Sequence, residues 1–216
     1  MKNIIRFIEP LREQLGSALK SVILYGSCAK LKDFNKNLLY DFLFIVNDFS
    51  VEEAGIFKSW KKSLPRWFSF RFIIMSKKEL LDSSDVFPIE YKDIIDCYNV
   101  IYGEDIVKDI KLTDENLRHQ IEYELRAKKQ RFQSASIDMN YSSRKFANEF
   151  YAHCKSLIIL SKHFLRIVDD EAIKEELDKT IKEVERLASI KPDFDNVGML
   201  IKVYNSIINS VDSFLK

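Results

Sequence analysis

Glycine and proline are scarce in this chain of 216 residues, which contains five glycines and four prolines. So few turn-forming residues exclude collagen and other Gly/Pro-rich architectures, and a content of 46% hydrophobic and 31% charged residues argues against disorder. No run of 18 or more apolar residues occurs, so a transmembrane helix is not expected. Residues 1–15 mix apolar and charged side chains, unlike a signal peptide. We therefore expect a cytoplasmic protein with no membrane partner.

Cysteine and histidine are also few, with three of each: Cys28, Cys97, Cys154, His119, His153 and His163. The cysteines are odd in number, far apart and without a CxxC pair, which fits neither a disulfide framework nor a zinc site. The histidines share no spacing that would bring two of them to one helix face as metal ligands. The sequence therefore predicts no structural metal centre.

An excess of charge of one sign is missing as well, since 34 basic residues face 33 acidic ones. Residues 1–110 hold 16 of each sign, and residues 111–216 hold 18 basic and 17 acidic residues, so neither half resembles a nucleic-acid-binding arm. The basic run at 126–131 follows Glu122 and Glu124 and is typical of a solvated helix face. A nucleic-acid partner is not indicated.

The first half of the chain carries short apolar runs rich in β-branched and aromatic residues, which predict strands at 21–25, 42–46, 68–75 and 98–102. Apolar stripes at helical spacing between them predict helices at 3–19, 50–63 and 76–83. The last of these begins with Ser76 and Glu79, the pattern of a capping box. This order predicts a small mixed sheet covered by helices.

The second half changes to helical periodicity throughout. It predicts helices at 114–138, 143–168, 170–189 and 195–215, with short connections between them. Four amphipathic helices joined in this way favour an antiparallel bundle. We therefore expect an α+β protein with an α/β domain at 1–108 and a helical bundle domain at 109–216.

The most specific segment is an apolar strand that ends at Gly26 and Ser27, followed fourteen residues later by Asp41 at the start of another apolar run. Gly26 would let the backbone approach a phosphate closely, and Ser27 with the following amides would offer hydrogen-bond donors. Asp41 could then hold Mg²⁺ against that phosphate. On spacing alone, a tight turn followed by a strand-capping carboxylate explains the same pattern more simply.

This arrangement resembles the nucleotidyltransferase superfamily, whose signature is an apolar strand, Gly-Ser, ten to fifteen residues, and then Asp-x-Asp on another strand. Segments 86–94, 100–105 and 117–126 are similar to an uncharacterised bacterial and archaeal branch with a helical C-terminal domain, so the resemblance covers most of residues 20–135. It implies a nucleotidyltransferase-like fold, and in active members Mg²⁺ and a nucleoside triphosphate (NTP) as cofactor and donor.

Helical partners of such domains sometimes belong to the HEPN group, whose ribonuclease members place His four to six residues after Arg. Here eight residues separate Arg144 from His153. HEPN-like architecture stays open, and HEPN-type RNA cleavage is not supported.

The sequence departs from the active pattern of the superfamily at its carboxylates. Asp41 is followed at the second position by Leu43 and preceded by Leu39, so either alignment leaves one carboxylate of the pair. The third carboxylate of active members comes from a later strand, and Arg71 is the only charged residue of 68–75. One carboxylate beside an arginine would not hold two Mg²⁺ ions. The catalytic carboxylates are therefore expected to be degenerate.

Three further residues are candidates for the same cleft. Lys30 and Lys32 follow the Gly-Ser turn and could contact phosphates without Mg²⁺, although two solvated lysines on a short helix would have the same pattern. Glu90 belongs to an acidic stretch that resembles a segment of the family, which places it as a ligand-binding candidate. The predicted ligand-binding residues are thus Gly26, Ser27, Lys30 and Glu90, with Asp41 as catalytic and metal-binding residue if the protein is active.

Three functions remain open from the sequence. The first is a protein of this fold that has lost transfer activity and binds a nucleotide, a phosphate or a partner. The second is an active Mg²⁺-dependent enzyme that moves a nucleoside monophosphate from an NTP to a hydroxyl of a protein, RNA or small molecule, with Asp41 and Glu90 or Asp48 as metal ligands. The third is a structural oligomerisation module without a ligand. In the first and third, the bundle could supply a homodimer interface.

Overall fold

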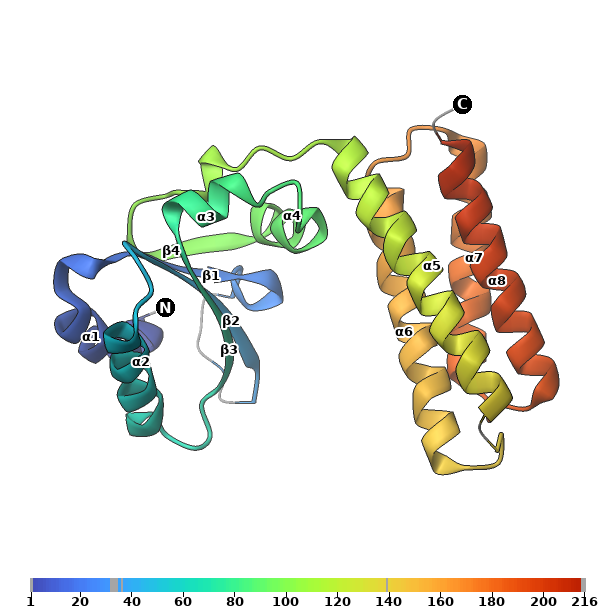
Figure 1. The fold of residues 1–216 in the computed structure, drawn as a ribbon, viewed down its shortest axis with the longest axis horizontal. Helices are drawn as coiled ribbons and strands as arrows, with labels where there is room; N and C mark the ends of the chain where they lie inside the picture. Colours follow the sequence, from blue (N-terminus) through green and yellow to red (C-terminus); the bar gives the residue numbers. More distant parts are fainter. Residues whose placement is uncertain (1, 32–34, 36, 139, 215–216) are drawn as a thin grey trace. The chain divides into compact units, whose positions relative to one another are not determined.

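The chain is an α+β protein in which a four-stranded mixed sheet is followed by helices, as the computed structural model shows (Figure 1). The structure describes residues 2–31, 35, 37–138 and 140–214. Its internal contacts divide the chain into two compact units, Met1–Leu112 and Thr113–Lys216. The predicted fold class is confirmed.

The sheet of the first unit has the order β3-β2-β1-β4. Its strands are β1 (Leu19–Tyr25), β2 (Leu39–Val46), β3 (Ser69–Ser76) and β4 (Tyr98–Gly103). β1 pairs antiparallel with both β2 and β4, whereas β2 and β3 run parallel, which makes the sheet mixed. Because successive side chains of a strand point to opposite faces, each strand contributes to two different cores.

One face of the sheet is covered by α1 (Lys2–Leu15) and α2 (Val51–Ser63). The apolar stripe of α1 packs with Phe42, Phe44 and other alternate residues of the strands in a single core. Trp60 of α2 is buried there, and its indole N–H donates to the carbonyl oxygen of Phe7 at 2.7 Å. This core is rich in aromatic side chains and covers one face of the sheet.

The other face is covered by α3 (Lys77–Asp82), α4 (Pro88–Asp96) and a 3-10 turn at Val107–Asp109. Leu43 and Ile45 of β2 pack here against Tyr91 and Ile94 of α4. The predicted capping box at the start of α3 is confirmed, because Ser76 and Glu79 exchange side-chain and backbone hydrogen bonds. This second face positions α4 over the strand that carries Asp41.

The C-terminal end of β4 packs closely against the start of β1. The buried hydroxyl of Ser21 lies 3.1 Å from the carbonyl oxygen of Tyr102 and 2.8 Å from that of Glu104. Gly103 has φ of +81°, and a Cβ there would stand 1.8 Å from the carbonyl oxygen of Lys20. Only glycine lets the two strands approach this closely.

Two predictions for the first unit are wrong in detail. The helix expected at 3–19 ends at Leu15, since Gly16–Ala18 forms a 3-10 turn and β1 already begins at Leu19. The predicted order of elements also lacked α4, which has nine residues and therefore too few apolar positions to show a clear period. Proline at its first turn is compatible with a helix start, because that N–H has no partner within the helix.

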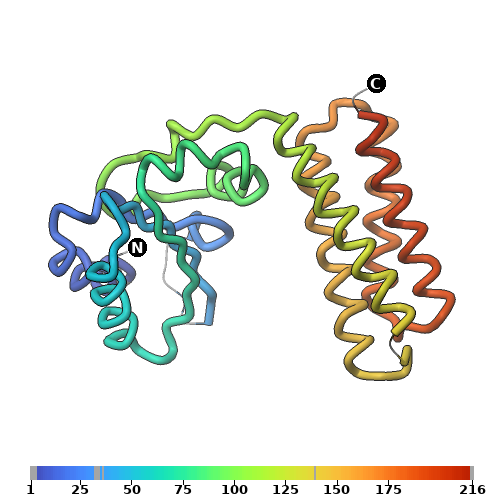
Figure 2. The backbone as a smooth tube through the Cα atoms, in the orientation of Figure 1, coloured from blue at the N-terminus to red at the C-terminus, as the bar shows by residue number. Residues whose placement is uncertain are grey.

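The second unit is a bundle of four helices, α5 (Asp114–Asp138), α6 (Arg144–Leu165), α7 (Glu171–Ala188) and α8 (Phe194–Ser213). Each helix contacts the next along the chain, and α8 returns to α5. The four run up and down beside one another (Figures 1 and 2), as predicted for an antiparallel bundle. In the part of the chain that the structure describes, no helix has both the length and the apolar character needed to cross a bilayer.

Candidate functional site

Asp41 lies on the face of the sheet that α4 covers, in line with Leu43 and Ile45. Its register partners are Tyr25 on β1 and Arg71 on β3. Paired residues on neighbouring strands share a face, so the three polar side chains form a row across the sheet.

Arg71 holds Asp41 through both carboxylate oxygens. Its Nε donates to Oδ1 at 2.7 Å and its Nη2 donates to Oδ2 at 3.0 Å, which is a bidentate, charge-assisted pair. The Asp41 side chain is 16% exposed and the Arg71 side chain 68%. The hydrogen bonds to Asp41 and then its negative charge raise the pKa of Arg71 above its ordinary value. A guanidinium therefore occupies the position on β3 that faces Asp41.

A cavity of about 420 Å³ opens at this pair. Strands β1, β2 and β3 form its floor, and α4 adds Glu90 and Asp93 from above. The lining residues are Tyr25, Asp41, Arg71, Phe72, Ile73, Glu90 and Asp93. Three carboxylates and one guanidinium give the lining a formal charge of about −2 at neutral pH.

The pKa of the Tyr25 hydroxyl is raised by burial and by this acidic lining. Burial raises the pKa of Tyr25 to about 12, and the negative charges of Asp41, Asp93 and Glu90 act in the same direction, whereas Arg71 opposes them. The phenol is therefore protonated at neutral pH and can donate a hydrogen bond within the cavity.

The Gly-Ser turn lies next to Asp41 and is not part of the cavity lining. Gly26 has φ of +72°, and a Cβ there would stand 3.6 Å from Oδ2 of Asp41. Ser27 and Lys30 are exposed, and neither is among the residues that line the cavity. Lys32 lies outside the described residues. Of the predicted ligand-binding residues, Glu90 shares the cavity with Asp41 and Gly26 borders it.

The donors present do not fit a pair of Mg²⁺ ions. Both oxygens of Asp41 are engaged by Arg71, and no group of three or more potential metal ligands occurs among the described side chains. Asp48, the other predicted ligand, lies two residues beyond the far end of β2. The five extended steps from Asp41 to Val46 already span about 17 Å. Asp48 lines a different cavity and is outside the reach of the one at Asp41.

Sequence reasoning did not anticipate Tyr25 and Asp93 as lining residues. Tyr25 was visible only as the last residue of an apolar strand, and its pairing with Asp41 requires the register of β1 against β2. Asp93 follows Glu90 by three residues, which is one turn on a helix, so recognising α4 would have placed both carboxylates together.

Among the comparisons with known proteins, only the one with solved structures bears on the fold. No family model and no curated protein sequence matches the chain. A crystal structure of the spectinomycin adenyltransferase AAD(9) from Enterococcus faecialis with ATP and spectinomycin is similar to it, with a TM-score of 0.52 and 13% sequence identity over 98% of each chain. At this identity the likeness concerns the fold alone. The chain thus has a nucleotidyltransferase-like fold, as the sequence resemblance predicted.

Proposed function

We propose that this chain is a nucleotidyltransferase-fold protein that binds a nucleotide or another phosphate-bearing ligand and does not carry out metal-dependent transfer. The bidentate pair of Arg71 with Asp41 is the observation that carries the proposal. Two-metal transfer needs carboxylates that clamp both ions. Here Arg71 neutralises the carboxylate of Asp41 and occupies both of its oxygens, so Asp41 is not open to a metal ion.

Arg71 also supplies the contact for a phosphate. A guanidinium has five N–H donors, and Asp41 accepts two of them, which leaves three for a ligand oxygen. Glu90 and Asp93 bring acceptors suited to hydroxyl or amino groups. The formal charge of the lining repels a bare triphosphate, so the cavity favours a ligand with one phosphate and several hydrogen-bond donors over free ATP.

Thermal unfolding with ligands tests the proposal. Wild type, Asp41→Asn, Arg71→Gln and the control Arg66→Gln, an exposed arginine outside the cavity, are melted with each nucleoside mono- and triphosphate, with and without Mg²⁺. A ligand at 100 times its dissociation constant adds about 2.7 kcal/mol, a shift of several degrees. We expect a shift that needs no Mg²⁺, disappears in Arg71→Gln and survives in Arg66→Gln.

The alternative function is an active Mg²⁺-dependent nucleotidyltransferase. It is favoured by one observation, that Glu90 and Asp93 line the same cavity as Asp41. It would require the Arg71 side chain to leave Asp41. A thermal shift that depends on both Mg²⁺ and Asp41, with release of pyrophosphate from an NTP, would establish this function and overturn the first. Absence of any nucleotide-dependent shift would support the structural oligomerisation module instead.

A further inference from the structure

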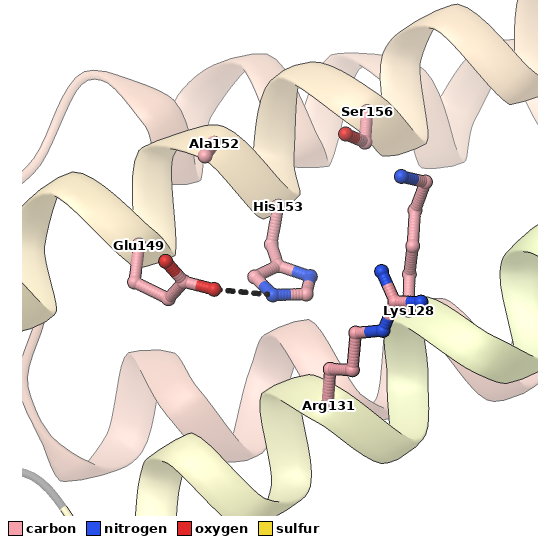
Figure 3. A pocket seen from close by; sticks show the side chains of 6 residues that line it. All are labelled: Lys128, Arg131, Glu149, Ala152, His153 and Ser156. Carbon is pink, nitrogen blue, oxygen red and sulfur yellow. Dashed lines mark ion pairs between the residues drawn. The ribbon is translucent and has the colours of Figure 1, made fainter.

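A second polar cavity, open to solvent, lies between α5 and α6 of the helical bundle (Figure 3). Its volume is about 140 Å³, room for roughly five water molecules at liquid density. The lining residues are Lys128, Arg131, Glu149, Ala152, His153 and Ser156. A tetrahedral oxyanion such as phosphate fits in this volume.

Two cations line the α5 side of this cavity. Lys128 and Arg131 are three residues apart and therefore lie on one face of the helix. The Lys128 amine lies 3.4 Å from a carboxylate oxygen of Glu124, while Arg131 has no carboxylate within ion-pair distance among the described residues. Figure 3 shows both head groups on the side of the His153 ring away from Glu149.

His153 is a fixed, neutral part of the wall. Its Nδ1 lies 2.7 Å from the hydroxyl of the fully buried Tyr204, and its Nε2 lies 3.3 Å from a carboxylate oxygen of Glu149. A carboxylate oxygen only accepts hydrogen bonds, so Nε2 bears the proton and donates it to Glu149, and Nδ1 of the neutral ring accepts from the Tyr204 hydroxyl. Burial, with the charges of Lys128 and Arg131, lowers the pKa of His153 although Glu149 opposes them.

In this arrangement the His153 ring lies between the negative charge of Glu149 and the positive charges of Lys128 and Arg131. Glu149 is engaged by the imidazole, whose two nitrogens both have partners, so His153 is not available as a base or nucleophile. Lys128, Arg131 and the Ser156 hydroxyl remain as donors around the open volume. We propose that the cavity binds a phosphate monoester group through these three side chains, independently of the cavity at Asp41.

Titration of the full-length protein with inorganic phosphate at constant ionic strength tests the site, followed by ¹H–¹⁵N NMR. We expect saturable shifts centred on Lys128, Arg131 and Ser156. Loss of one charge-assisted hydrogen bond corresponds to about tenfold or more in affinity, which is the effect expected for Arg131→Gln and for Lys128→Gln. The control Lys129→Gln removes a neighbouring charge that does not line the cavity and should leave the affinity within about twofold.

Several results would overturn the proposal. Shifts that grow linearly with phosphate, or that map away from the three donors, would mean general ionic screening. An equal loss in Lys129→Gln would assign the effect to the overall charge of α5. Arg71→Gln separates this site from the first cavity, because it should leave the phosphate shifts in the bundle unchanged.

Discussion

Replacing Arg71 by aspartate tests whether this side chain keeps metal out of the cavity. Arg71→Asp removes the ion pair and sets a second carboxylate opposite Asp41 on the neighbouring strand. Because the arginine side chain is 68% exposed, loss of the pair itself costs less than about 1 kcal/mol. Two carboxylates about 5 Å apart repel by about 1–3 kcal/mol at effective dielectric constants between 80 and 20. Without Mg²⁺ the variant should therefore unfold at a lower temperature.

Magnesium should reverse this loss in the variant and leave the wild type unchanged. A site with a dissociation constant near 1 mM would return about 1.4 kcal/mol at 10 mM Mg²⁺, or several degrees in the first unit. Circular dichroism melting at constant ionic strength, with and without Mg²⁺, measures both effects, and Arg66→Asp controls for the added charge. A saturable Mg²⁺-dependent shift in wild type that Asp41→Asn abolishes, or the absence of any such shift in Arg71→Asp, would contradict this role of Arg71.

Three further predictions concern stability. Gly103→Ala should cost about 3 kcal/mol or more in urea unfolding, because its Cβ would meet the carbonyl oxygen of Lys20, whereas Gly55→Ala inside α2 has open space around it and should add about 0.5–1 kcal/mol. His153 has a pKa below its ordinary 6.5 in the folded state, so the unfolded chain binds more protons and stability should fall as pH drops through 6.5. His153→Gln should flatten that slope in melts between pH 7.5 and 5, and a slope that disappears equally in His119→Gln would contradict this origin. Asp170→Ala should cost about 1 kcal/mol of helix α7, because Asp170 accepts hydrogen bonds from the amides of Ala172 and Ile173, and an unchanged melting curve would show the cap to be dispensable.

Local sequence patterns predicted most elements of the fold. The apolar runs gave all four strands, and the stripes at helical spacing gave all four bundle helices within a few residues of their ends. The capping box at Ser76 and Glu79 was readable because its two partners are three residues apart. Such signals can be recognised in the sequence because they depend only on neighbours within one helical turn or one strand.

The candidate site was less predictable because it depends on contacts between distant residues. Arg71 stood out as the only charge of its strand, but its pairing with Asp41 needs the parallel register of β2 and β3, thirty residues apart. His153 and Tyr204 are 51 residues apart and meet only after α6 and α8 have packed. The sequence offers the histidines only as metal ligands or as part of an Arg–His ribonuclease pattern, and neither interpretation predicts the polar cavity in the bundle.

The position of β4 has a consequence for how the first unit is synthesised. β1 lies inside the sheet, yet its second neighbour is the last strand of that unit to leave the ribosome. Until residue 103 has emerged, a nascent chain can pair β1 with β2 only and leaves the other edge of β1 without its ladder. Truncations that end before β4 should therefore expose an aggregation-prone edge, while those that end beyond Leu112 retain a complete sheet.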